Sequence, residues 1–180
     1  MYYVNQNLVD LHRIVYQNNR KEYLRLDLNE NPGGLPQEFI DEVLNDITPK
    51  FVSQYPETLE FENCLAKFLN VNYDNLCLVN GSSEGIRHII EAFSAPGGKI
   101  VGVVPSYAMY QVYAQMYGRE FIQVKYNDDL TISADTIIDA LSEDVDLLVL
   151  LNPNNPVGNA YSNEEFEKIL EAAKKYEITI

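Results

Sequence analysis

The sequence predicts an α/β fold with three layers, in which a mostly parallel sheet lies between two layers of helices. Two observations lead to this prediction. From residue 59 onward, short apolar runs alternate with amphipathic stretches of helical length, and Pro and Gly fall between them, where they mark turns. Strands that alternate with helices form parallel sheets, because each helix returns the chain to the same end of the sheet.

The spacing of apolar residues gives the individual elements. A continuous apolar run bounded by turn residues indicates a buried strand, and apolar residues that recur on one face indicate a helix. The expected helices cover residues 59–69, 84–95, 107–117, 133–141 and 163–175, and the expected strands cover residues 76–79, 99–104, 120–125 and 146–151, with another strand starting at residues 177–180.

Two helix starts carry residues that are typical of caps. Ser133 and Asn163 each precede an amphipathic stretch, and the short polar side chains of Ser and Asn accept hydrogen bonds from the free amides of a first turn. We therefore expect each of them to cap its helix.

The N-terminal region differs from the rest of the chain. Residues 26–34 are rich in turn-forming residues and should lie outside the main sheet, as an arm. We expect residues 1–50 to form this arm and part of a small domain, and residues 51–180 to form the first, incomplete part of a large domain. The last expected strand begins at the very end of the sequence, which suggests a truncated sheet.

Composition excludes several classes of partner. The formal net charge of −14 argues against nucleic acid and against an anionic membrane, since both need clustered Lys and Arg. No secretion signal or membrane-spanning run is visible, so a cytoplasmic location is expected.

Cys64 and Cys77 are interpreted as core thiols. His12 and His88 each stand alone without metal-ligand spacing, and no metal site is expected.

The segments after three of the expected strands could carry chemistry, because ligands of open α/β sheets bind beyond the carboxyl ends of the strands. Ser82 and Ser83 follow Gly81 at the start of a helix, where free amides and hydroxyls bind phosphate. The alternative, stronger for this motif alone, is that one serine merely caps the helix while Glu84 favours its dipole. The spacing matches neither the dinucleotide fingerprint nor the phosphate loop.

The other two segments are more distinctive. Tyr107 stands at a strand-to-helix corner, where its ring could stack on a flat cofactor. The alternative is a core or subunit-contact residue, which we accept for Tyr113 and Tyr117 but not for Tyr107, because of its position at the corner. Residues 152–158 read Asn-Pro-Asn-Asn-Pro-Val-Gly, with two prolines around an Asn pair. Proline fixes backbone angles, and a cis bond is possible before it, so this segment favours a side chain held for function over a plain turn.

Taken together, the motifs at residues 80–86, 105–110 and 152–156 resemble the pyridoxal-phosphate aminotransferases of the aspartate aminotransferase fold (class I/II, fold type I). Residues 26–32 and 54–57 point to the histidinol-phosphate aminotransferase branch. The resemblance extends from about Leu24 to Ile180.

This resemblance implies roles for individual residues. Ser82, Ser83 and the adjacent Glu84 would belong to the cofactor-phosphate site, Tyr107 would stack on the pyridine ring, and Asn155 would bind its phenolic oxygen. Tyr55 completes the cofactor-binding residues. It would reach the cofactor phosphate of the neighbouring subunit, which implies a homodimer with shared active sites. The substrate would lie under an arm that carries Asn29 and Asn31.

The resemblance also implies an activity. We expect a pyridoxal 5′-phosphate enzyme of amino-acid biosynthesis that moves an amino group between an amino donor, histidinol phosphate-like or another amino acid, and a 2-oxo acid. The family's Schiff-base lysine is expected beyond Ile180, so no catalytic residue is assigned here and the 180-residue chain alone is expected to be inactive. Two alternatives stay open: a decarboxylase or lyase acting on a phosphorylated amino acid, and a non-catalytic ligand-binding module.

Overall fold

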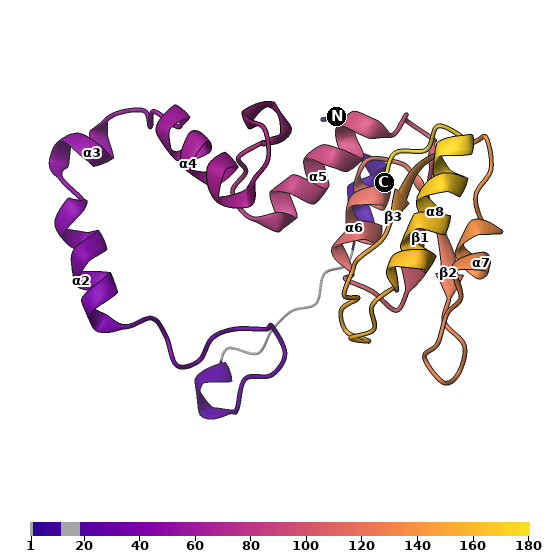
Figure 1. The fold of residues 1–180 in the computed structure, drawn as a ribbon, viewed down its shortest axis with the longest axis horizontal. Helices are drawn as coiled ribbons and strands as arrows, with labels where there is room; N and C mark the ends of the chain where they lie inside the picture. Colours follow the sequence, from indigo (N-terminus) through magenta and orange to yellow (C-terminus); the bar gives the residue numbers. More distant parts are fainter. Residues whose placement is uncertain (1, 12–18) are drawn as a thin grey trace. The chain divides into compact units, whose positions relative to one another are not determined.

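Three parallel strands form the sheet of this protein. In the computed structural model, which describes residues 2–11 and 19–180, β1 (Lys99–Val104) lies between β2 (Glu120–Lys125) and β3 (Val145–Val149). Val101 of β1 is in register with Ile122 on one side and Leu148 on the other. The central strand is the most deeply buried, because it has a strand on each side and helices above and below (Figure 1).

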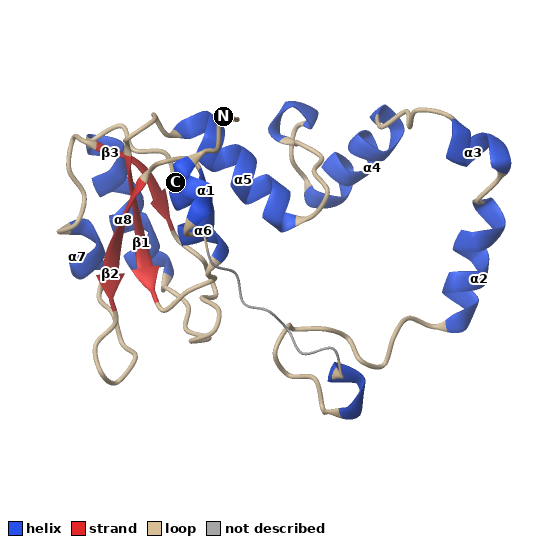
Figure 2. Cartoon of the chain, turned by 180° about the vertical axis from the view of Figure 1, so that it is seen from behind, coloured by secondary structure: helices blue, strands red, loops and turns tan. Residues whose placement is uncertain are grey.

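Helices cover both faces of the sheet, as predicted. One face packs against α7 (Ala134–Ile138) and α8 (Asn163–Lys175), and the other packs against α5 (Ser82–Phe93) and α6 (Met109–Met116) (Figure 2). Side chains of a strand alternate between faces. In β1 and at Leu147 and Leu148, neighbouring residues accordingly belong to different core clusters, while the pairing of β1 with β3 is irregular near Val145. The first cluster contains Val101, Val103, Val124, Ala134, Ile137, Leu141, Val145, Leu148, Ile169, Ala173 and Ile178, and the second contains Ile90, Ile100, Ala114 and Leu147.

The chain divides into two compact units, which we describe separately. The first contains residues 1–13 and 79–180, with the sheet and the short helix α1 (Gln6–Val9), which contacts α6. The second contains residues 14–78. Its elements are η1 (Arg20–Glu22), α2 (Gln37–Asp46), α3 (Pro49–Ser53), α4 (Leu59–Leu69) and η2 (Tyr73–Asn75). The expected division into residues 1–50 and 51–180 stays a prediction about the whole protein.

Most predicted elements are present, with shifted ends. The strands at 99–104 and 120–125 and the helices at 59–69 and 163–175 have the expected bounds. β3 begins and ends earlier than the strand expected at residues 146–151. Helix α5 begins two residues earlier than expected, and α6 and α7 are shorter. The end of the chain behaves as the start of a strand, since Thr179 forms a parallel bridge with Leu147.

One cap was predicted correctly and one was displaced by a residue. The Ser133 hydroxyl accepts a hydrogen bond from Thr136 N and caps α7. Asn163 is not a cap, because Ser162 takes that position: its hydroxyl accepts from Glu165 N, and the Glu165 carboxylate accepts from Ser162 N in return. This reciprocal capping box satisfies two amides, whereas Asn163 could satisfy one.

The predicted strand at 76–79 is wrong for this structure. The run is extended but pairs with no strand in the part of the chain that the structure describes, and Val79 is 38% exposed. An apolar run becomes a strand only when a neighbouring strand takes up its backbone hydrogen bonds. Cys77 in this run and Cys64 on α4 are both exposed free thiols, so the interpretation of core thiols is also wrong here.

Among the described residues, no helix combines the length and the apolar character that crossing a membrane requires.

Candidate functional site

The start of α5 leaves hydrogen-bond donors free. Gly81 is the N-cap with φ 84° and ψ 169°, a backbone conformation that suits glycine, and no side chain caps the helix. The alternative that Ser82 or Ser83 serves as the cap is therefore not what the structure shows. The amides of Ser82, Ser83 and Glu84, the first three helical residues, have no acceptor in the described chain, and a helix start of this kind attracts anions.

Ser83 and Tyr107 bring two of the predicted segments together. The Ser83 hydroxyl lies 3.2 Å from the Tyr107 phenolic oxygen, although the two residues are 24 positions apart. Both side chains are half-buried, while Ser82 is exposed and its hydroxyl makes no hydrogen bond in the described chain. Tyr107 also packs edge-on against Tyr110, with ring centroids 6.0 Å apart, and burial raises the pKa of Tyr110.

Glu84 turns its carboxylate back onto its own loop. Its Oε2 accepts a hydrogen bond of 2.6 Å from Asn80 N, and this bond is the main reason that the pKa of Glu84 lies below its usual range. Its Oε1 lies 3.6 Å from Arg87 Nη2 and 3.8 Å from His88 Nε2. Since both oxygens have partners, the amide is the group that Glu84 leaves available at the helix start.

The loop after β3 separates its two adjacent asparagines. Asn155 is exposed and its side chain makes no hydrogen bond in the described chain, so its amide is available for a ligand. Asn154 is only 2% exposed and makes hydrogen bonds inside the protein. The bonds before Pro153 and Pro156 are both cis, as the sequence suggested for this loop. Composition and spacing alone did not indicate which asparagine faces inward, because both have the same side chain; only the resemblance to the family singled out Asn155 as the residue that meets a ligand.

These segments meet at the carboxyl edge of the sheet. The turn with Tyr107 follows β1, and the loop with Asn155 follows β3. Ser83 contacts Tyr107, and Ser106 donates a hydrogen bond of 2.7 Å to Asn154 Oδ1. Hydrogen bonds thus connect the start of α5 to the turn after β1, and that turn to the loop after β3.

The remaining predicted site residues lie in the unit of residues 14–78. Tyr55 follows α3 and its side chain is 99% exposed. Asn29 is exposed and has φ 53°, a left-handed conformation that Asn tolerates better than most residues. The side chain of Asn31 is used in its own turn, where Nδ2 donates to Gly34 O and Oδ1 accepts from Gly33 N.

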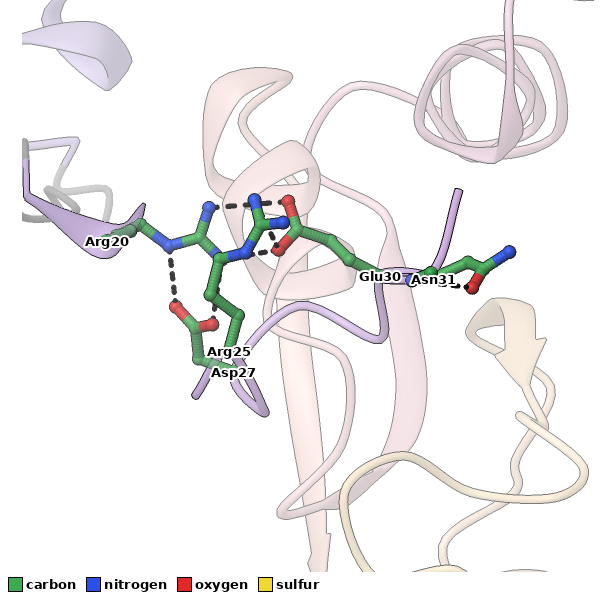
Figure 3. A network of polar contacts seen from close by, with 6 residues as sticks. Arg20, Arg25, Asp27, Glu30 and Asn31 are labelled. Carbon is green, nitrogen blue, oxygen red and sulfur yellow. Dashed lines mark hydrogen bonds and ion pairs between the residues drawn. The ribbon is translucent and has the colours of Figure 1, made fainter. Parts of the chain in front are cut away.

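An ionic network that the sequence analysis missed involves Asp27 and Glu30, on either side of Asn29 in the sequence. The guanidinium of Arg20 lies between two carboxylates, with Nη2 2.7 Å from Asp27 Oδ1 and 2.8 Å from Glu30 Oε2 (Figure 3). Its hydrogen bonds are the main reason that the pKa values of both carboxyls are lowered. Arg25 approaches Glu30 at 3.7 Å. The only sequence signal was the presence of Arg and acidic residues near the arm, which proximity alone does not turn into a pairing.

No group of three His, Cys, Asp or Glu side chains suited to a metal ion occurs within residues 2–11 and 19–180. Among the described residues, the carboxylates within ion-pair distance of the His88 ring are those of Glu84 and Glu91, at 3.8 and 4.0 Å. His12 lies outside the described residues.

The fold and the site define a class of protein. Residues 21–180 match the model of the family described as aminotransferase class I and II, and the chain belongs to this family. Pyridoxal phosphate is the cofactor of this family. Its fold is that of fold type I enzymes, as predicted from the motifs.

The similar proteins point to one branch of the family. A histidinol-phosphate aminotransferase of Chlorobaculum tepidum is 34% identical over 83% of this chain and 44% of its own length. A histidinol-phosphate aminotransferase of Thermococcus gammatolerans is 30% identical over 91% of this chain and 47% of its own. The crystal structure of the histidinol-phosphate aminotransferase from Clostridium acetobutylicum has a TM-score of 0.71 at 31% identity, covering 84% of this chain and 44% of that one. The chain thus spans less than half of the length of these relatives.

The residues present fit pyridoxal phosphate. The unpaired amides at the start of α5 and the free Ser82 hydroxyl suit its phosphate. A Cβ built on Gly81 would meet no atom within 4 Å, so the approach to these amides is open. The half-buried ring of Tyr107 and the free amide of Asn155 suit a flat, polar ring.

Proposed function

We propose that the protein is a pyridoxal-phosphate-dependent aminotransferase of the histidinol-phosphate type, which moves an amino group between an amino donor and a 2-oxo acid. The observation that carries the proposal is the contact between Ser83 and Tyr107, because it joins a phosphate-binding helix start to an aromatic ring at the same edge of the sheet. The names of the similar proteins support histidinol phosphate, or a related amino compound, as the donor.

Each residue of the site has a distinct task in this proposal. The amides of Ser82, Ser83 and Glu84, together with the serine hydroxyls, bind the cofactor phosphate at the positive end of the helix dipole. Tyr107 supports one face of the ring, and Asn155 donates a hydrogen bond to the phenolic oxygen. When bound, the cofactor supplies the electron sink for the chemistry at the substrate, while the protein supplies binding and orientation.

We further propose a homodimer with shared active sites, in which Tyr55 reaches the cofactor phosphate of the neighbouring subunit. The almost complete exposure of Tyr55 supports this role, since no described residue of its own unit holds the phenol. The arm with Asn29 and Asn31 would then cover the substrate, and the ion pairs of Arg20 connect Asp27 and Glu30, which lie on either side of Asn29 in the sequence. The proposed location of the protein is the cytoplasm, and its proposed role is amino-acid biosynthesis.

The first experiment is spectroscopic. Protein produced from the natural gene with pyridoxal phosphate is expected to be yellow, and borohydride is expected to fix the cofactor covalently to a lysine that peptide mass spectrometry locates. None of the eight lysines of this chain is buried in a loop, where an amine could be held against the cofactor, so the labelled lysine is expected outside residues 1–180. They are Lys21, Lys50, Lys67, Lys99, Lys125, Lys168, Lys174 and Lys175. A colourless protein that borohydride does not label would contradict the proposal and favour a non-catalytic binding module.

The second experiment separates the transaminase from a lyase of the same fold. Incubation with histidinol phosphate and a 2-oxo acid is expected to produce the amino acid that corresponds to the oxo acid. A second incubation, with a phosphorylated amino acid that carries a carboxyl group and without an oxo acid, tests the alternative. Release of carbon dioxide or of phosphate from that amino acid, with no transfer of the amino group from histidinol phosphate, would favour the decarboxylase or lyase, since fold and cofactor do not determine the reaction.

A further inference from the structure

Asn154 is a buried polar residue whose side chain bridges three segments of the sheet unit. Its Nδ2 donates to the Pro105 carbonyl and to the Tyr126 hydroxyl, both at 2.9 Å, and its Oδ1 accepts from Ser106 Oγ at 2.7 Å. An amide nitrogen has two hydrogens, so both donors of Asn154 are used. Pro105 and Ser106 form the turn after β1, and Tyr126 directly follows β2.

The loop that contains Asn154 is closed by its own backbone. Asn154 N donates to Asn159 O at 2.8 Å, and Gly158 N donates to Asn154 O at 2.6 Å. The Tyr126 hydroxyl, which accepts from Asn154, donates in turn to Asn159 Oδ1 at 2.9 Å. The direction of these hydrogen bonds is therefore consistent from Asn154 through Tyr126 to Asn159, with each donor facing an acceptor.

Asn154 is adjacent to residues that are proposed to contact the cofactor, but Asn154 itself is buried and would not contact the cofactor. The next residue along the chain is Asn155, whose side chain is exposed and free, and Ser106 immediately precedes Tyr107. A change at Asn154 would therefore move the aromatic ring and the free amide relative to each other.

We propose that Asn154 is a positioning residue that holds Tyr107 and Asn155 at a fixed separation. At this separation, Tyr107 would contact the ring face and Asn155 the phenolic oxygen of the same cofactor molecule. This inference rests on the proposed function. The physical reason is that two ligand-binding groups on separate loops cooperate only if their spacing matches the ligand, and small misplacements of such groups are costly. Ser106 and Tyr126 contribute to the same positioning, because each makes a hydrogen bond with the Asn154 side chain.

A simpler role would be to satisfy buried polar groups, which every buried asparagine must do. The two roles predict different results. Loss of hydrogen bonds lowers the stability of the protein in either case, whereas only a positioning residue changes the affinity of the folded protein for the cofactor. Cofactor affinity of the folded apoprotein is thus the informative quantity.

The test uses apoprotein from the natural gene, titrated with pyridoxal phosphate well below the unfolding midpoint of each variant. Asn154→Ala is expected to raise the dissociation constant about tenfold, since several hydrogen bonds that hold the loops are lost. Ser106→Ala and Tyr126→Phe, which each remove part of the bridge and are less disruptive, are expected to raise it by a smaller factor in the same direction. If Asn154→Ala does not fold, the affinities of Ser106→Ala and Tyr126→Phe for pyridoxal phosphate decide the test.

The matched control is Asn127→Ala. Asn127 also uses its side-chain amide, donating to Thr131 Oγ1 at 3.0 Å, but it belongs to the loop after β2 and makes no hydrogen bond to the other two loops within the described residues. Its affinity for the cofactor is expected to equal that of the wild type.

Three outcomes are distinguishable. Weaker binding by the bridge variants but not by Asn127→Ala supports the inference. Lower unfolding midpoints with unchanged affinity would overturn it and leave Asn154 a structural residue. Absence of cofactor binding by the wild type would contradict the proposed function itself, independently of Asn154. The absorption maximum of the bound cofactor gives a second readout, because a displaced Asn155 amide would change it.

Discussion

The hydroxyl of Ser83, in the first turn of α5, lies 3.2 Å from the phenolic oxygen of Tyr107, in the turn after β1. The pair joins the helix start that leaves three amides unpaired to the ring that stands beside it. The Ser83 hydroxyl can face Tyr107 because Gly81, and not a serine, occupies the N-cap position.

This contact predicts how much the hydroxyl and the ring of Tyr107 each contribute to the affinity for pyridoxal phosphate. Tyr107→Phe keeps the ring and loses the hydroxyl contact, so the affinity for pyridoxal phosphate is expected to fall by up to about tenfold. Tyr107→Ala also loses the ring and should bind more weakly still. Equilibrium titration measures both. Tyr117→Phe is the control, since the Tyr117 hydroxyl donates to Glu91, 3.1 Å away; a larger loss for Tyr117→Phe would argue against the assigned role.

Gly81 is expected to be intolerant of a side chain. At φ 84° and ψ 169°, alanine adopts a conformation that costs about 1–3 kcal/mol, so Gly81→Ala should lower the unfolding midpoint. Gly85→Ala is the control within the same helix. There a Cβ would lie 3.4 Å from Val79 Cγ2, and replacing a helical glycine stabilises by about 0.5–1 kcal/mol. Thermal unfolding of the two variants should therefore shift in opposite directions, and equal shifts would contradict this explanation.

Glu84 is expected to make stability depend on acidity. The pKa of its carboxyl is lowered by the hydrogen bond from Asn80 N, so its stabilising contribution is present above the pKa of the unfolded chain and is lost as the pH falls through the folded value. Glu84→Gln should have a lower unfolding midpoint than the wild type at about pH 7, and the difference should shrink as the pH falls below about 4.

The control for this prediction is Glu171→Gln on α8. The carboxylate of Glu171 is exposed and makes no hydrogen bond or ion pair within the described residues, so its effect at neutral pH should be smaller. A difference between Glu84→Gln and the wild type that persists unchanged in acid would show that charge is not its cause.

The core beneath the sheet predicts a contrast between neighbours on α8. Ile169 is 0% exposed, and Ile169→Ala is expected to destabilise the protein by about 2–5 kcal/mol, because it removes packed methyl groups and leaves a cavity. Leu170 is 38% exposed, and Leu170→Ala should cost much less. Denaturant unfolding measures both; similar losses would mean that α8 is not packed as described.

The sequence by itself determined the class of fold, and it located the segments that we propose to carry the chemistry. Buried strands and amphipathic helices leave a local pattern, and β1 and β2 therefore have the predicted bounds. The motifs around Ser82, Tyr107 and Asn155 could be located because turn residues and helix starts are also local features, and the family that they indicated is the family to which the chain belongs.

Only the tertiary structure decided which of several equivalent residues does what. Asn154 and Asn155 have the same side chain and are adjacent, and their composition and spacing do not tell which one is buried. The hydrogen bonds to Ser106 and Tyr126, which are far away along the chain, hold Asn154 inside the protein. The run at 76–79 has the composition of a strand, yet strand formation depends on a neighbouring backbone that the run itself does not contain. Periodicity is local and can be read along a chain, whereas pairing is non-local and requires the partners to be brought together.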